Sequence, residues 1–222
     1  MATYDLEEQE QLDELKTWWK MHGNLVTGVV TAAAIGVLAW QGWNWWQRSQ
    51  AAQASGLYGG LQQAAALHDA KRSREIAGEL IDKFSSTAYA GMGALLSARV
   101  QAESGDAKTA QVQLTWAADN AQDPGLRDLA RLRLAAILVD QKAYDEASKS
   151  LAAEPAPALA PRFDEMKGDI FAAQGKTAEA KVAYDAALAK LGADSSDAGK
   201  TRAHAAYREL LQSKADTLPG AH

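Results

Sequence analysis

The sequence predicts an all-α protein in which a single N-terminal transmembrane helix is followed by a solenoid of helix pairs. Residues 25–46 contain no Asp, Glu, Lys or Arg, and a helix of this length spans about 33 Å, enough for one bilayer crossing. From residue 47 onward the chain is rich in alanine and lacks the alternating β-branched pattern of strands. Small and large apolar residues also recur there at a nearly constant spacing, which indicates repeated helix pairs.

Residues 1–24 form an acidic tail with six carboxylates and two lysines, Lys16 and Lys20. The acidic residues fill the first turns of a predicted helix over residues 5–20 and the lysines its last turns, an order that the helix dipole favours. One face of this helix is apolar, so it could rest on the bilayer surface. Binding of a partner and a plain solvated tail are equally compatible with the pattern.

The apolar segment, residues 25–46, has tryptophans on both sides. Trp18 and Trp19 precede it, and its far end contains Trp40, Trp43, Trp45 and Trp46. Indole rings favour the headgroup level of a bilayer. The Ala-Gln-Ala sequence at residues 52–54 resembles a signal-peptide cleavage site, but it lies well beyond the apolar run, and the segment before that run is long and acidic. The segment is therefore predicted to be an uncleaved transmembrane anchor in contact with the lipid bilayer.

The basic residues nearest the anchor favour one orientation. Lys16 and Lys20 precede the anchor and Arg48 follows it. Because positive charge is retained on the cytoplasmic side, this bias predicts a cytoplasmic N-terminus. The domain after the anchor would then lie on the opposite side of the membrane.

Every fourth residue on one face of the anchor is small, at Gly28, Ala32 and Gly36. Such a stripe lets a second transmembrane helix approach closely. Small residues are also common in lipid-facing membrane helices, so helix packing and lipid contact both stay open.

A three-part pattern recurs within residues 47–192. Four alanines are separated by 33, 37 and 33 residues, at Ala77, Ala110, Ala147 and Ala180. Four residues after each stands a large apolar residue, at Ile81, Leu114, Leu151 and Tyr184. Twelve residues before each stands a small one, at Ala65, Ala98, Ala135 and Gly168. Small residues at facing positions let antiparallel helices pack closely, and the large residue fills the gap to the next pair.

Turn signals agree with this pattern. Gly105-Asp106 and Gly175-Lys176 precede their alanines by five residues, where the first helix of a pair must end and reverse. In the middle pair Gln141-Lys142 takes this place without glycine. Residues 47–192 therefore resemble tetratricopeptide (TPR) repeats, whose period is about 34 residues.

A last helix is predicted in the C-terminal segment, residues 193–222. The Ser-Ser-Asp sequence at residues 195–197 is a helix N-cap signal, which predicts a helix from about 198 to 214. Its Tyr207, Leu210 and Leu211 would cover the exposed end of the stack, because terminal repeats need such a cap.

The first helices of stacked pairs line a concave surface, which predicts a groove that binds a partner. The candidate residues are Met92, Leu95, Arg99, Glu103, Leu129, Leu132, Ala136, Arg162, Glu165 and Asp169. This surface would be apolar in its centre and charged toward both ends, which suits a helix or an extended segment of another protein. The alternative is that the C-terminal helix buries the apolar residues.

Composition and motifs argue against several functions. Residues 47–222 contain 21 basic and 22 acidic residues without basic runs, which disfavours nucleic-acid binding. The chain has no cysteine and four scattered histidines, and no phosphate loop, HExxH, GxSxG or catalytic carboxylate pair stands out. The sequence therefore predicts a non-enzymatic protein without cofactor or metal.

Several features together resemble the YfgM family of ancillary SecYEG translocon subunits. They are the acidic tail that ends in Trp18-Trp19-Lys20, the sequence His22-Gly23-Asn24, the Trp-flanked anchor, the TPR-like pairs, and Lys167-Gly168-Asp169 in the last repeat. The resemblance implies a bacterial inner-membrane anchor with a cytoplasmic N-terminus and a periplasmic TPR domain. It also implies association with the SecYEG channel and with a PpiD-like periplasmic chaperone, so that emerging proteins meet periplasmic chaperones.

Two other functions are compatible with the same sequence. One is a membrane-tethered TPR assembly factor for another envelope complex, in cytochrome maturation or cell division. The other is an enzyme regulator or hydrolase with an irregular site. Only the translocon function predicts that the Sec channel is a major co-purifying species.

Overall fold

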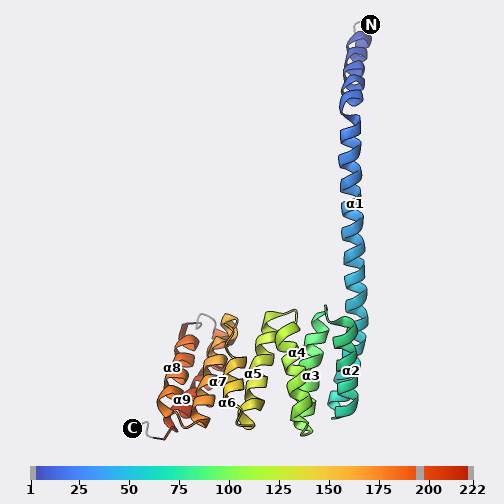
Figure 1. Cartoon of the computed structure of the whole chain (residues 1–222). Helices are drawn as coiled ribbons and strands as arrows, with labels where there is room; N and C mark the ends of the chain where they lie inside the picture. Colours follow the sequence, from blue (N-terminus) through green and yellow to red (C-terminus); the bar gives the residue numbers. More distant parts are fainter. Residues whose placement is uncertain (1–3, 194–197, 220–222) are drawn as a thin grey trace. The chain divides into compact units, whose positions relative to one another are not determined.

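The computed structural model describes residues 4–193 and 198–219, and the side chains of residues 12–191 and 204–219 within them. This part of the chain consists of α-helices and one 3₁₀ helix, without strands. It forms two compact units, Met1–Gln50 and Ala51–His222. The prediction of an all-α fold is confirmed, and the helices are labelled in Figure 1.

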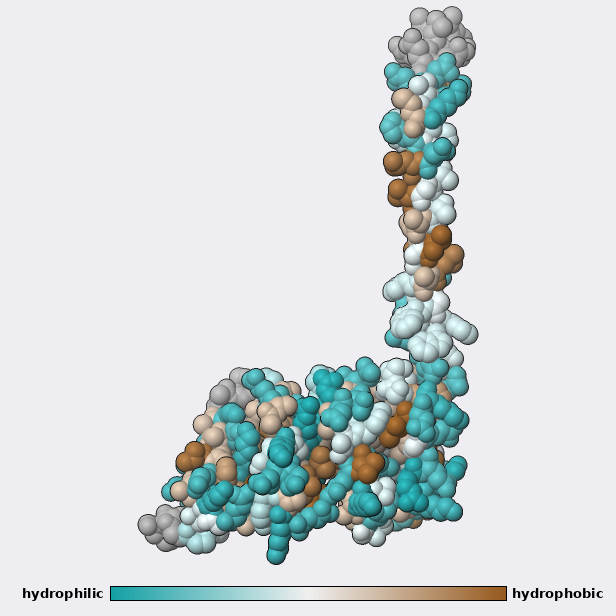
Figure 2. All heavy atoms as spheres, viewed as in Figure 1, coloured by the Kyte–Doolittle hydropathy of each residue, from teal (hydrophilic) through white to brown (hydrophobic). Residues whose placement is uncertain are grey.

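Helix α1 (Tyr4–Ala66) contains the predicted tail helix and the predicted anchor without a break between them. In the first unit its apolar side chains are exposed, and Figure 2 shows hydrophobic residues on its surface. Ile35, Leu38 and Trp40 have 63%, 67% and 67% of their surface accessible. Among the described residues, this is the one helix long and apolar enough to cross a membrane by length and composition. So large an apolar surface without protein cover is typical of a lipid-facing segment.

The second unit is a stack of antiparallel helix pairs, arranged side by side in Figure 1. The end of α1 pairs with α2 (Ala70–Phe84), α3 (Ala88–Glu103) with α4 (Ala107–Asn120), and α5 (Pro124–Asp140) with the short α6 (Tyr144–Ser150). A 3₁₀ helix, η1 (Pro157–Leu159), leads into α7 (Ala160–Ala173). Helix α7 pairs with α8 (Thr177–Ala193), and α9 (Ala198–Asp216) packs on α8.

Four hydrophobic clusters hold the stack together, and each is centred on one helix pair. The alanines of the sequence repeat, Ala77, Ala110, Ala147 and Ala180, have no accessible surface and each lies in a different cluster. The last cluster also contains Leu211, Ala215 and Leu218 from α9 and its C-terminal end. Leu211 has no accessible surface, whereas Leu210 is 48% accessible and takes no part in the cover.

The four turns inside the helix pairs share one backbone conformation. Each contains a residue with positive φ, at His68 (53°), Gly105 (88°), Lys142 (60°) and Gly175 (75°). At each turn the next residue's N–H donates to a carbonyl five positions earlier, as Asp106 does to Gln101 at 2.9 Å. This is the hydrogen bond that ends a helix at a left-handed residue. The sequence signals had located three of these turns.

Replacing Lys142 with glycine is expected to stabilise the protein by about 0.5–1 kcal/mol, because a left-handed conformation strains a residue with a Cβ. Chemical denaturation of the full chain in detergent measures the change. Gly105→Ala is the matched control, since φ is 88° there and an added Cβ would meet no atom within 4 Å. It should lose about 1 kcal/mol through backbone strain alone. Equal stability of the two variants would contradict the shared turn conformation.

Candidate partner-binding groove

Helices α3 and α5 enclose two adjoining hollows, here called the arginine groove. Both hollows are lined by Arg99 of α3 and Arg133 of α5. The first, of about 240 Å³, is otherwise lined by Tyr58, Met92, Leu95, Leu96, Leu126 and Leu129. The second, of about 290 Å³, is completed by Ala98, Ala102, Leu114, Ala136 and Ile137. The groove is therefore apolar on both sides of a pair of arginines.

The two arginines differ in their partners. Arg99 is exposed, and its Nε lies 3.6 Å from Glu103 Oε1 on the same helix. Arg133 donates from Nη1 to the carbonyl oxygen of Leu95 at 3.2 Å, and within the described residues it pairs with no carboxylate. Burial, and second to it the charge of Arg99, lower the pKa of Arg133. An anion between the two guanidinium groups would relieve their repulsion.

Half of the predicted groove residues line these hollows, namely Met92, Leu95, Arg99, Leu129 and Ala136. Leu132 does not, because its side chain is 8% accessible and packs in a core cluster with Ala135 and Phe163. Glu103 lies outside the hollows, where it contacts Arg99 and also His68, whose Nδ1 is 3.6 Å away.

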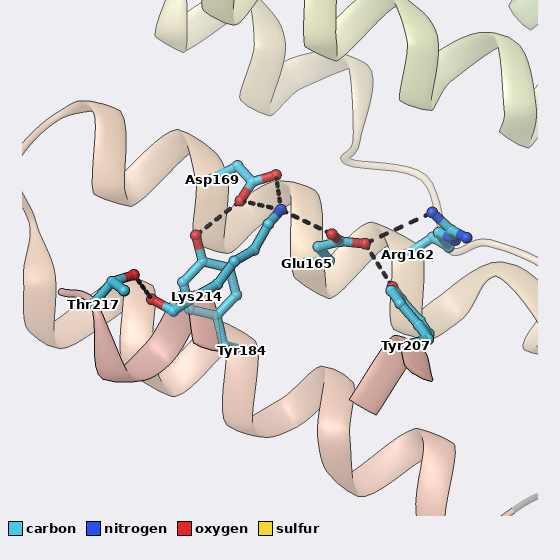
Figure 3. Close-up of polar contacts among 7 residues, drawn as sticks. All are labelled: Arg162, Glu165, Asp169, Tyr184, Tyr207, Lys214 and Thr217. Atoms are coloured by element: carbon cyan, nitrogen blue, oxygen red, sulfur yellow. Dashed lines mark hydrogen bonds and ion pairs between the residues drawn. The ribbon is translucent and has the colours of Figure 1, made fainter. Parts of the chain in front are cut away.

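The charged end of the predicted groove is occupied by the chain itself. Arg162, Glu165 and Asp169 of α7 face α9, as Figure 3 shows. Glu165 accepts hydrogen bonds from Tyr207 at 2.6 Å and from Lys214 at 2.8 Å. The sequence alternative was that the C-terminal helix covers the apolar residues. Instead α9 pairs with the two carboxylates and leaves the apolar centre open, so Glu165 and Asp169 are occupied by the chain itself, whereas the side chain of Arg162 stays 58% accessible.

Lys214 lies at the centre of this contact, here called the α9 latch. Its Nζ donates to both carboxylate oxygens of Asp169 at 2.8 Å, and Tyr184 donates to the same carboxylate at 2.8 Å. The guanidinium of Arg162 lies 4.5 Å from the centre of the Tyr207 ring. Four side chains thus surround Glu165 and Asp169 with donors and positive charge, which stabilises both carboxylates in a partly buried position.

The latch shifts the titration of its donors. Burial, together with hydrogen bonds to Asp169 and Glu165 respectively, raises the pKa of Tyr184 and of Tyr207. Burial alone would lower the pKa of Lys214, but its hydrogen bonds to Asp169 and Glu165 outweigh burial and raise it. All three groups therefore keep their protons through neutral pH.

Sequence reasoning missed Arg133 and Lys214. Arg133 stands four residues after Leu129 and three before Ala136, so helical spacing alone places it on the predicted groove face. Lys214 gave no comparable signal, because its partners Glu165 and Asp169 are 49 and 45 residues away in the chain.

The predicted packing stripe of the anchor lies on the exposed surface of α1. A Cβ added at Gly28 or Gly36 would meet no atom within 4 Å. Ala32 is exposed as well. The stripe is thus open along its length within the first unit.

The similarity of this chain to known proteins covers residues of both units. Residues 16–220 match the tetratricopeptide repeat-like domain family. An ancillary SecYEG translocon subunit of Neisseria gonorrhoeae is 32% identical over 216 residues, which cover 96% of this chain and 98% of the relative. The chain belongs to the YfgM family. A relative of the same name from Haemophilus influenzae is 30% identical over 187 residues, covering 83% of this chain and 90% of that protein.

Family membership confirms the resemblance found in the sequence and the TPR-like nature of the repeats. The matched residues include most of α1 and all of α9. The apolar N-terminal helix and the last helix are therefore both part of the architecture that the family shares.

Proposed function

We propose that this protein is a non-enzymatic inner-membrane subunit associated with the SecYEG translocon. The observation that carries the proposal is its relatedness, over nearly the full length of both chains, to a protein named an ancillary SecYEG translocon subunit. The exposed apolar surface of α1 and the open groove between α3 and α5 support it. The apolar surface attaches the protein to a bilayer, and the groove offers a surface for a protein segment.

The proposed topology divides the chain at the anchor. Residues 1–24 lie in the cytoplasm, residues 25–46 cross the inner membrane, and residues 47–192 with the C-terminal segment 193–222 lie in the periplasm. Lys16 and Lys20 before the anchor and Arg48 after it support this orientation. In this topology the arginine groove is exposed to the periplasm.

The solenoid then links emerging proteins to periplasmic chaperones, with a membrane-anchored PpiD-like chaperone as the partner. TPR solenoids bind protein segments along their concave surface. The arginine groove supplies such a surface, whereas the α9 latch fills the equivalent positions on α7. Chaperone binding is thus expected at α3 and α5.

Affinity purification from detergent-solubilised inner membranes tests the translocon association. The Sec channel is expected as a major co-purifying species, together with the chaperone. Recovery of a cytochrome-maturation or cell-division complex without the Sec channel would instead support a tethered assembly factor. A matched sample with an unrelated single-pass anchor in place of residues 25–46 shows how much recovery depends on the anchor.

Changing Gly28, Ala32 and Gly36 together to leucine is expected to leave membrane insertion intact, because hydrophobicity rises. Recovery of the membrane partner should fall, since bulky side chains prevent close approach of a second helix. Quantitative co-purification measures the loss, and leucine at Val30, Ala34 and Val37 is the control on the opposite face of the helix. Undiminished recovery would identify the stripe as lipid-facing.

A further inference from the structure

The arginine groove has a chemical character that points to a particular kind of partner. Its first hollow presents a phenol ring and flexible aliphatic side chains, including Tyr58, Met92 and Leu96. Methionine adapts its shape to different apolar groups. The second hollow presents smaller side chains, such as Ala102 and Ala136 beside Ile137. Each hollow therefore suits one apolar side chain of a bound segment.

Positive charge lies between the two hollows and is only partly neutralised. Arg99 has Glu103 as a neighbour on its own helix, 3.6 Å away and exposed to solvent. Exposed pairs of this kind contribute little, about 0–1 kcal/mol, so Glu103 does not block exchange for another carboxylate. Arg133 offers its remaining guanidinium N–H groups beyond the bond to Leu95. Arginine binds carboxylates through two parallel hydrogen bonds, so a carboxylate placed here meets fixed donors.

We propose that the arginine groove binds a segment of a partner protein in which an aspartate or glutamate is bracketed by two apolar side chains. The carboxylate lies between Arg99 and Arg133, and the apolar side chains enter the two hollows. This inference rests on the proposed function in one respect, that the solenoid binds protein partners. A lipid headgroup would supply an anion but no apolar side chain on each side of it, so a protein segment fits both hollows better.

Site-specific photocrosslinking of the full chain in its native membrane tests the proposal. A benzophenone amino acid is placed at Met92, which lines the first hollow, or at Ala136, which lines the second. Mass spectrometry then identifies the crosslinked segment. Both positions are expected to attach to one partner segment, with an acidic residue between the two points of attachment.

Charge reversal in the groove tests whether the two arginines bind the crosslinked segment or merely lie near it. Arg99→Glu and Arg133→Glu should each lower the crosslink yield about tenfold, since a like charge replaces the ion pair. Arg133→Lys should retain more of the yield, because it keeps the charge and loses only the paired hydrogen bonds. Arg72→Glu is the matched control, since Arg72 also pairs with a glutamate of its own helix, at 3.5 Å, and is exposed. Thermal midpoints close to that of the wild type establish that each variant is folded.

A compensating change completes the test. Once the acidic residue of the partner is identified, its replacement by arginine should restore crosslinking to the Arg133→Glu variant. Crosslinks to lipid alone, to a segment without an acidic residue, or with a yield that Arg99→Glu and Arg133→Glu leave unchanged would overturn the proposal. So would the absence of any protein crosslink from both positions.

Co-purification of the Sec channel is measured on the same samples, so that the two proposals fail separately. If the Sec channel co-purifies but the crosslink yield does not depend on Arg99 or Arg133, the groove proposal is contradicted and the translocon association stands. If an acidic segment is crosslinked in the groove but the Sec channel does not co-purify, the translocon association is contradicted and the groove proposal is supported.

Discussion

Replacing Gly168 with alanine is expected to destabilise the last helix pair by about 1–3 kcal/mol, the usual cost of overpacking a core. A Cβ at this position would lie 2.5 Å from Cε1 and 2.6 Å from Cδ1 of Tyr184. The ring cannot move aside easily, because Tyr184 is 3% accessible and its hydroxyl is bonded to Asp169 at 2.8 Å. Helices α7 and α8 would therefore have to separate.

Thermal unfolding of the full chain measures this effect, and Gly59→Ala serves as its control. Gly59 is an exposed helical glycine at which an added Cβ would meet no atom within 4 Å. Alanine there should stabilise the helix by about 0.5–1 kcal/mol. The double variant Gly168→Ala with Tyr184→Leu should recover part of the loss, since the smaller side chain can turn away. If Gly168→Ala and Gly59→Ala changed stability in the same direction, close contact between α7 and α8 would be refuted.

Replacing Lys214 with glutamate is expected to release α9 from the stack at a cost of about 2–3 kcal/mol. The change places a third carboxylate beside Glu165 and Asp169, both of which Lys214 now contacts at 2.8 Å. Loss of one partner of a buried ion pair costs about 3–5 kcal/mol, and the partial exposure of Lys214 reduces this figure. The cover over Tyr184 and Leu191 would be lost with α9.

Hydrogen exchange in residues 204–219 reports the release directly. Protection should fall there and stay unchanged in α3 and α4, which do not contact the latch. Lys83→Glu is the matched control, because Lys83 contacts Glu79 at 2.9 Å with both side chains exposed. Its effect should stay within about 0.5 kcal/mol. Equal protection of residues 204–219 in wild type and Lys214→Glu would show that the latch does not hold α9.

The pH dependence of the latch follows from the raised pKa values of Lys214, Tyr184 and Tyr207. A group whose pKa is higher in the folded state stabilises that state while it is protonated. The contribution is complete below the unfolded pKa, about 10 for tyrosine and 10.4 for lysine, and is lost as pH rises through the folded pKa. Protection of residues 204–219 is therefore expected to be constant through neutral pH and to fall above about pH 10.

The repeat architecture could be predicted because it depends on local spacing. Small residues at Ala110 and Ala147 and the left-handed turns at Gly105 and Gly175 are visible in the sequence, and each determines structure within one helix pair. The lining of the groove was less predictable. Leu132 and Arg133 are adjacent on α5, and both have helical spacing from Leu129 and Ala136 that is compatible with the groove face. Packing of the folded chain places Leu132 in the core and leaves Arg133 in the groove.

The α9 latch could not be predicted, because its partners meet only after the last pair has folded. No local sequence pattern indicates that a lysine on one helix pairs with two carboxylates on another helix when 45 or more residues separate them. The C-terminal helix itself was predicted from its capping residues, which are local. Its position at the charged end of the surface, and not over the apolar centre, depends on contacts between residues that are distant in the sequence.

The division of the solenoid core into four clusters has a consequence for cooperativity. Each cluster draws its residues from one pair and its immediate neighbours, as the cluster of Ala94, Leu114 and Ala130 does. In such a linear array the free energy of unfolding is a sum of local terms and nearest-neighbour terms. Release of α9, whose cluster contains residues of α7 and α8 but none of α3 or α5, therefore propagates weakly toward α3 and α5. The helices that line the arginine groove can remain folded while the C-terminal end frays, so the two ends of the solenoid unfold as separate units.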